Sequence, residues 1–172
     1  QKRAAFPART IPVTALSPLD SAKQTLLLLL PELILLATAT VMMTAGAFVR
    51  APRKVWSIIA TGAMIVGLGL LILNHDVAYD LYAGVAINDA LSFYARLVFL
   101  LAGLILFALA GEQVDDARAP EFFGSLLMIH AGAMLVAASN EIVFLFVGLE
   151  LVSIPTYLML YLSRRTSATQ EA

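Results

Sequence analysis

The sequence predicts an all-α integral membrane protein with about five transmembrane helices. Of its 172 residues, 60% are hydrophobic and only 13% are charged, whereas soluble domains have about 45–50% apolar and about 25% charged residues. The apolar residues form runs of the length that a helix needs to cross a bilayer, about 20 residues. The net charge of −1 offers no basic stripe to nucleic acid, and the absence of cysteine excludes thiolate metal sites and iron–sulfur clusters in this chain.

Two regions differ in composition. Residues 1–24 are polar and contain three prolines, so we expect an extended or disordered tail. Residues 25–172 form the transmembrane domain, in which each helix is long enough to span the hydrocarbon core. We place the spans near residues 31–49, 55–73, 92–111, 122–139 and 142–162.

Local signals set the limits of these spans. Pro31 suits the first turn of a helix, where its missing N–H removes no hydrogen bond. Pro52 stops the first helix and separates it from the second. Only "SNE" (139–141) joins the fourth and fifth spans, which predicts a tight helical hairpin.

The positions of lysine and arginine predict the orientation, because basic residues gather at the cytoplasmic ends of helices. We therefore expect the loops 74–90 and 140–141 to lie outside, and 50–54, 112–121 and 163–172 to lie in the cytoplasm. The cytoplasmic group contains Arg50, Arg53, Lys54, Arg118, Arg164 and Arg165, and the opposite side has Lys2, Arg3, Arg9 and Lys23 in the tail.

Glu150 lies in the middle of the last apolar run, "FLFVGLELVSIPTYLMLYL" (144–162). It is about nine residues into its helix and therefore about 13 Å deep. Inserting such a residue costs about 2.5–3.5 kcal/mol, which the 13 Leu, Ile, Phe and Val of residues 142–162 offset at about 0.3–0.6 kcal/mol each. The helix can therefore insert with its carboxylate. Ionisable groups at this depth usually mark an ion pathway, so we predict that Glu150 binds and releases a proton.

The residues after Glu150 add polar groups. Ser153 and Tyr157 follow it at helical spacing on the same face, and Pro155 leaves the carbonyl of Leu151 without its intrahelical donor. The alternative is a structural Glu150 that is paired with a neighbouring helix.

Two other titratable residues lie in apolar runs. Glu32 falls in the first turn of its helix, where a carboxylate is favoured by the helix dipole. We expect a solvated residue near the lipid headgroups, and a place on an ion pathway is the alternative. His130 lies mid-span and is expected to be a packing histidine with a satisfied ring nitrogen; a proton relay is the alternative. Two histidines and no cysteine make a metal site improbable.

Several stretches resemble one family. The hairpin "AASNEIVFLFVGLELVSIPTYLMLYL" (137–162) is similar to the fourth and fifth helices of the antiporter-like membrane subunits of respiratory complex I. Within that group, "FVGLELVSIPTY" resembles subunit N of NADH–quinone oxidoreductase, which is subunit 2 in mitochondria. Related subunits have Trp directly before this glutamate, where this chain has Leu149. Three further stretches agree: "LPELILL", "INDALSFYAR" and "EFFGSLLMIHAGAMLVAASN".

The resemblance implies a proton-translocating subunit that is driven by quinone reduction elsewhere in the complex, with Glu150 as its proton relay. Family members have about 14 helices, so this chain resembles the N-terminal portion. We expect it to be truncated at its C-terminus, and the alternative is a split subunit whose remainder is a separate chain. The family glutamate acts with a lysine on the seventh helix, and the only lysines here are Lys2, Lys23 and Lys54. We therefore expect no catalytic activity from this chain alone, although the complex is an enzyme.

The same resemblance implies the surroundings of the chain. It implies no cofactor or metal in this subunit, since the NADH, FMN, iron–sulfur clusters and quinone of the complex are bound by other subunits. The expected partners are other membrane subunits, lipid and protons. The expected location is the bacterial plasma membrane, or alternatively the mitochondrial inner membrane. Other functions remain open: a related cation/proton antiporter, a membrane-bound hydrogenase subunit, or a purely structural membrane subunit.

Overall fold

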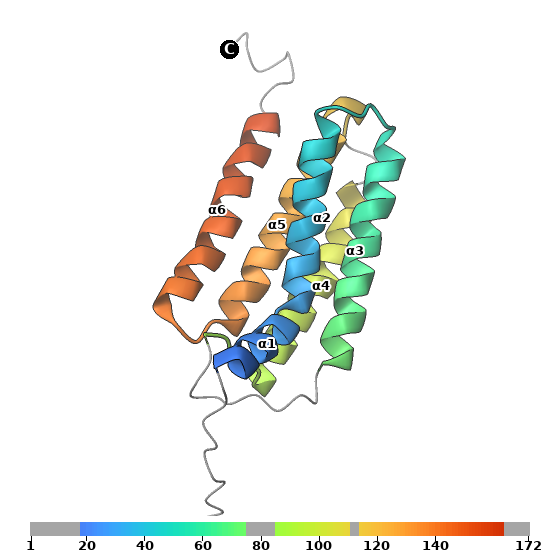
Figure 1. The fold of residues 1–172 in the computed structure, drawn as a ribbon. Helices are drawn as coiled ribbons and strands as arrows, with labels where there is room; N and C mark the ends of the chain where they lie inside the picture. The colour runs from blue at the N-terminus through green and yellow to red at the C-terminus, as the bar shows by residue number, and fades with distance from the viewer. Residues whose placement is uncertain (1–17, 75–84, 111–113, 164–172) are drawn as a thin grey trace, which may run out of the picture.

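The computed structural model describes residues 18–74, 85–110 and 114–163, and all the regular elements in those ranges are helical (Figure 1). The prediction of an all-α fold is therefore confirmed. The helices are α1 (Pro18–Leu28), α2 (Leu30–Gly46), α3 (Arg53–Leu73), α4 (Ala90–Ala110), α5 (Ala119–Ala138) and α6 (Ile142–Ser163), with a short 3₁₀ helix, η1 (Asp116–Arg118), before α5.

The five predicted spans correspond to α2 through α6. Four segments are long and apolar enough to cross a membrane on their own, and the bent pair formed by α1 and α2 makes a fifth. The 21 residues of α3 give a helix of about 32 Å, which matches a hydrocarbon core of about 30 Å. Pro31 lies at the start of α2, as predicted.

The expectation of an extended chain through residue 24 is wrong for residues 18–24, which belong to α1. Pro18 can begin a helix because the first turn needs no N–H from it, and the residues that follow it, such as Ala22, Lys23 and Gln24, favour helix. The axis of this helix turns by 68° at Leu29 before α2 begins. Residues 1–17 of the predicted tail lie outside the described residues.

Helix α5 forms the centre of the bundle. It lies against α2, α3, α4 and α6 (Figure 1). Of the residues in its membrane-spanning stretch, 61% are buried, compared with 11% in α6. The small residues Gly124, Ala131, Gly132 and Ala138 are buried on α5. Small residues are what close helix packing in a membrane requires, because packing contacts rather than water exclusion hold the helices together there.

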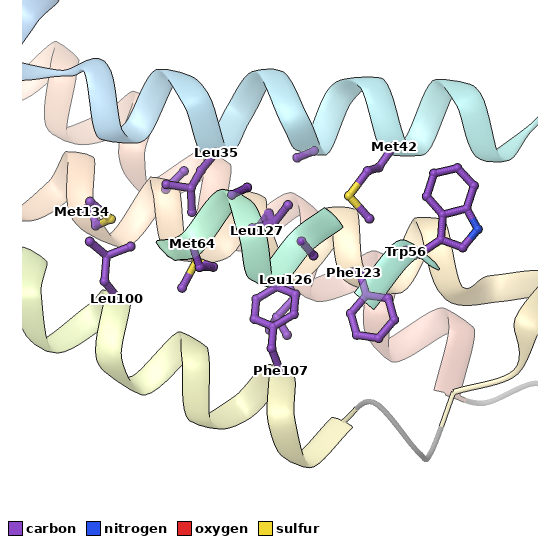
Figure 2. Packing of buried hydrophobic residues seen from close by; sticks show 14 of the residues in the cluster. Leu35, Met42, Trp56, Met64, Leu100, Phe107, Phe123, Leu126, Leu127 and Met134 are labelled. Carbon is purple, nitrogen blue, oxygen red and sulfur yellow. The ribbon is translucent and has the colours of Figure 1, made fainter. Parts of the chain in front are cut away.

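The main apolar core lies between α2, α3, α4 and α5 (Figure 2). The rings of Phe107 and Phe123 stack with their centroids 5.7 Å apart and their planes 17° apart. Each aromatic ring adds packing contacts at a depth where lipid gives no hydrophobic driving force. The fully buried members of this core include Leu35, Met42, Met64, Leu100, Phe107, Phe123, Leu127 and Met134.

The connections gather into two groups, one at each end of the bundle. At one end, the backbone N–H of Ile87 donates to the carbonyl of Ala138 at 2.8 Å and that of Asn140 donates to Val85 at 2.9 Å. At the other end, the backbone N–H of Arg53 donates to Asp116 Oδ1 at 2.9 Å. The sequence predicted that the loops 74–90 and 140–141 share one end and that 50–54 and 112–121 share the other, and the described parts of these loops agree. Which end faces the cytoplasm stays a prediction.

The last hairpin is set by two facing glycines. A Cβ on Gly132 would lie 2.8 Å from the carbonyl oxygen of Gly148, and a Cβ on Gly148 would lie 3.1 Å from the carbonyl oxygen of Gly132. The backbones of α5 and α6 therefore approach each other at a distance that only glycine allows. This close crossing lies two residues before Glu150 and fixes the depth of that residue against α5.

Candidate functional site

Glu150 lies on α6 beside an open groove that α6 forms with α5 and α2. The groove has a volume of about 390 Å³, and its lining is almost entirely apolar. Glu150 is half-buried in the structure. The residues that share the groove with it are Met43, Ser125, Met128, Phe146, Val147, Leu151, Ile154, Pro155 and Leu158.

No charged partner reaches this carboxylate. Within the described ranges, the structure has no salt bridge or hydrogen bond to the Glu150 side chain. The one polar side chain from another helix along the groove is Ser125, which is fully buried and whose Oγ has no hydrogen-bond partner there. The alternative of a Glu150 that is paired within these helices is therefore not supported. A charged carboxylate in apolar surroundings without a counterion is energetically costly.

Of the three residues on α6 that were predicted to add polar groups near Glu150, only Pro155 lines the groove with it. Ser153 donates its hydroxyl to the carbonyl of Leu149 at 2.9 Å, and Tyr157 is 70% exposed on the outside of the bundle. Pro155 is buried and lines the groove together with Leu151. A proline cannot donate to the carbonyl four residues before it, so on its own helix the polar group that Glu150 gains from Pro155 is the Leu151 carbonyl.

Glu32 has the opposite surroundings. Its side chain is 0% exposed, and that of Arg96, on α4, is 1% exposed. Arg96 Nη2 donates to Glu32 Oε2 at 2.8 Å, and Nε lies 2.6 Å from Oε1 in an ion contact that lacks hydrogen-bond geometry. The guanidinium thus faces both carboxylate oxygens, with one charge-assisted hydrogen bond and one close ion contact.

The expectation of a solvated Glu32 is therefore wrong. The physical reason is that the folded bundle brings the side chain of Arg96, on α4, to the start of α2, although the two residues are 64 positions apart. Arg96 was overlooked in the sequence, although an arginine inside the third apolar run is the same signal that identified Glu150.

The break between α1 and α2 explains why polar groups gather there. Pro31 has no N–H to give to the carbonyl of Leu27, four residues earlier, and this carbonyl instead accepts from Asn74 Nδ2 at 3.1 Å. The next carbonyl, of Leu28, accepts from Arg96 Nη2 at 2.9 Å. Backbone groups freed inside a membrane protein require such partners.

His130 is buried on α5. Its Nδ1 lies 2.7 Å from the carbonyl oxygen of Leu126, and since a carbonyl only accepts, Nδ1 carries the proton when the ring is neutral. The ring lies over Gly103 of α4, where a Cβ would be 2.6 Å from Cδ2. These contacts support the packing interpretation of His130. In the part of the chain that the structure describes, no three His, Asp or Glu residues gather in a way that could hold a metal ion.

The fold and this site define a class of protein: a multi-pass helical membrane protein with a carboxylate that lacks a counterion among the described helices. The chain is 30% identical over 151 residues to the NADH-quinone oxidoreductase subunit N of Bacillus anthracis, which covers 84% of this chain and 29% of that protein. It is 28% identical over 147 residues to the NADH-quinone oxidoreductase subunit N 2 of Rhizobium meliloti, covering 83% of this chain and 30% of that protein.

The chain is thus a homologue of subunit N of NADH-quinone oxidoreductase, which confirms the resemblance seen in the sequence. It is also 27% identical over 158 residues to the F420H2 dehydrogenase subunit N of Methanosarcina mazei, covering 86% of this chain and 32% of that protein. The chain spans a little under a third of the length of these relatives. No family model matches it.

Proposed function

We propose that this chain is part of a proton-translocating membrane subunit of an NADH–quinone oxidoreductase, respiratory complex I, and that Glu150 takes up and releases the proton. The observation that carries the proposal is the lack of any counterion for this carboxylate in the described helices, although it lies at mid-membrane depth. A carboxylate held in that way can change its protonation when a cation approaches or withdraws. A buried carboxylate with a permanent counterion has no such freedom.

Two features support a role for further helices in setting that charge. Of the residues in the membrane-spanning stretch of α6, 11% are buried, so most of this helix can contact lipid or other helices. The relatives are about three times as long as this chain, which leaves room for a lysine on another helix. In this proposal, quinone reduction elsewhere in the complex moves that lysine, and Glu150 responds by releasing its proton.

The test is proton pumping by membrane vesicles in which the natural complex contains Glu150→Gln, normalised to assembled complex. An amide cannot take up a proton, so we expect NADH-driven, quinone-coupled pumping to fall strongly while assembly is kept. Glu150→Asp retains the carboxyl group and should be milder. Glu141→Gln is the matched control, because Glu141 directly precedes α6 but its side chain is exposed. Normal pumping by Glu150→Gln contradicts the proposal.

The similarity to an F420H2 dehydrogenase subunit N favours a second candidate, in which a related complex with another electron donor uses the same proton site. Vesicles that pump with reduced F420 and not with NADH would indicate this candidate. A cation/proton antiporter instead predicts proton movement that follows a sodium gradient without any electron donor. A purely structural subunit predicts that Glu150→Gln has no effect on any of these fluxes.

A further inference from the structure

We propose that Glu32 and Arg96 form a fixed-charge clamp that positions α6 at Glu150, and that Glu32 does not itself carry a transported proton. The purpose of this positioning rests on the proposed function of Glu150, while the clamp itself rests on contacts of the described residues. It assigns a role to two charged groups that proton transfer through Glu150 leaves unexplained.

The pair is built to stay charged. An arginine guanidinium remains protonated in proteins, and its contacts with both oxygens of Glu32 stabilise the ionised carboxylate. Both side chains are almost completely buried, so neither is open to exchange protons with water. The two opposite charges therefore compensate each other within the described fold, whereas Glu150 has no such partner there.

The same pair holds the broken helix together. Arg96 donates to the carbonyl of Leu28 at the end of α1 and to Glu32 in the first turn of α2. A cation is favoured at the C-terminal end of a helix and an anion at the N-terminal end. Arg96 thus complements the end of one helix while Glu32 complements the start of the next, and together they stabilise the 68° bend.

The bend reaches α6 through an apolar cluster. Leu28 and Leu29, at the bend, are buried together with Ala86 and Leu135, and Phe144 and Leu151 of α6 pack against this cluster. Leu151 is the residue directly after Glu150. A change in the bend therefore acts on the turn of α6 that carries the proposed proton site.

The faces of α2 and α4 that carry Glu32 and Arg96 become apolar toward the centre of the bundle. Leu100, one turn further along α4, and Leu35, nearly one turn along α2, are 0% exposed. Ser92 is polar and buried on the same face of α4, but it lies one turn toward the start of the helix. On these faces of α2 and α4, no polar side chain of either described helix continues from the pair toward the centre of the bundle. The next polar group inward is His130 of α5, which packs over Gly103 beyond the apolar Leu100, and this interruption favours a clamp over a relay.

A cysteine reporter tests the clamp directly. These 172 residues contain no cysteine, so Leu28→Cys, at a site that is 2% exposed, adds a single thiol to this part of the subunit, and the same complex without the substitution gives the background labelling. Its rate of reaction with a small water-soluble maleimide in membranes reports opening of the bend. Ala119→Cys, at a site that is 0% exposed at the opposite end of the bundle, is the matched control for general unfolding.

The clamp is then removed one charge at a time and as a pair. Glu32→Met and Arg96→Met each leave one buried charge uncompensated, so we expect labelling at Leu28→Cys to rise by more than about tenfold with Ala119→Cys still protected. Pumping per assembled complex should fall in both. Glu32→Met together with Arg96→Met leaves no unpaired charge, and should label more slowly and pump better than either single variant.

Two results would overturn the clamp. One is a complex with Glu32→Met that stops pumping while Leu28→Cys stays protected, with no recovery in the double variant; Glu32 would then carry a proton. The other is equal labelling in the single and double variants. Normal pumping by Glu150→Gln contradicts the proposed function instead, and it leaves the labelling results, which need no pumping, to decide the clamp.

Discussion

Glu32 and Glu150 are both carboxylates within apolar helices, and their surroundings are opposite. Glu32 is fully buried against Arg96, which faces both of its oxygens. Glu150 is half-buried in an apolar groove and has no charged partner among the described residues. A carboxylate with a permanent cation contributes to the architecture, whereas one without a cation is free to respond to a charge that arrives later.

The difference shows that depth in a membrane does not by itself assign a role to an acidic residue. Glu150, near the helix centre, has to offset an insertion cost of about 2.5–3.5 kcal/mol if charged. Glu32 lies in the first turn of α2 but is fully buried, so its charge also carries a burial cost. Glu32 offsets it with an ion pair inside the described fold. Glu150 has no such compensation there, and this unbalanced cost is what makes it the stronger candidate for proton transfer.

The largest effect expected from this comparison is on stability, in Arg96→Met. Removal of the guanidinium leaves the Glu32 carboxylate buried without a partner, which costs about 3–5 kcal/mol. We expect a lower yield of assembled complex and a lower temperature of thermal denaturation in detergent. Lys54→Met removes an exposed positive charge and serves as the control.

The comparison is sharpened by Glu150→Gln in the same assay. Because Glu150 has no ion pair to lose among the described residues, this variant should denature within a few degrees of the wild type. A loss as large as that of Arg96→Met would show that Glu150 is also held in a structural pair.

A smaller loss is expected from Gly132→Ala at the crossing of α5 and α6. The added methyl group would lie 2.8 Å from the Gly148 carbonyl oxygen, so the helices must separate at a cost of about 1–3 kcal/mol. We expect weaker pumping, because the separation moves Glu150. Gly62→Ala is the matched control, since a Cβ there meets nothing within 4 Å. Equal behaviour of both variants would show that the crossing is not tight.

Asn74→Leu should have a milder effect on the Glu32 region. It removes the hydrogen bond to the Leu27 carbonyl that Pro31 leaves free, at a cost of about 0.5–1.5 kcal/mol. Labelling of Leu28→Cys should rise less than it does when Arg96 is replaced. A rise as large as that of Arg96→Met would place the main restraint of the bend at Asn74.

The smallest effect on activity is expected from two cysteine substitutions at exposed sites, one at each end of the bundle. Glu141→Cys and Lys54→Cys replace exposed side chains and should leave activity unchanged. The orientation predicts that an impermeant maleimide reaches Glu141→Cys from outside and Lys54→Cys from the cytoplasm. The reverse labelling would invert the positions of both carboxylates relative to the membrane and contradict the orientation.

The sequence by itself predicted α2 through α6, though not α1, and singled out Glu150 as a candidate site. Runs of about 20 apolar residues predicted α2 through α6, because a helix satisfies all of its backbone hydrogen bonds within one such segment. Glu150 could be singled out for the same reason, since a charge inside one run is visible without any knowledge of its neighbours. Arg96 was visible in the same way and was missed.

Only the tertiary structure decided what surrounds each charge. The side chains of Glu32 and Arg96 meet because the Arg96 side chain reaches from α4 to the start of α2 in the folded bundle, and no spacing along the chain predicts a contact between residues 64 positions apart. The carbonyls at the bend accept from Asn74, which follows the end of α3, and from Arg96 of α4. Counterions and backbone partners come from across the bundle, so whether a buried carboxylate is compensated is a property of helix packing.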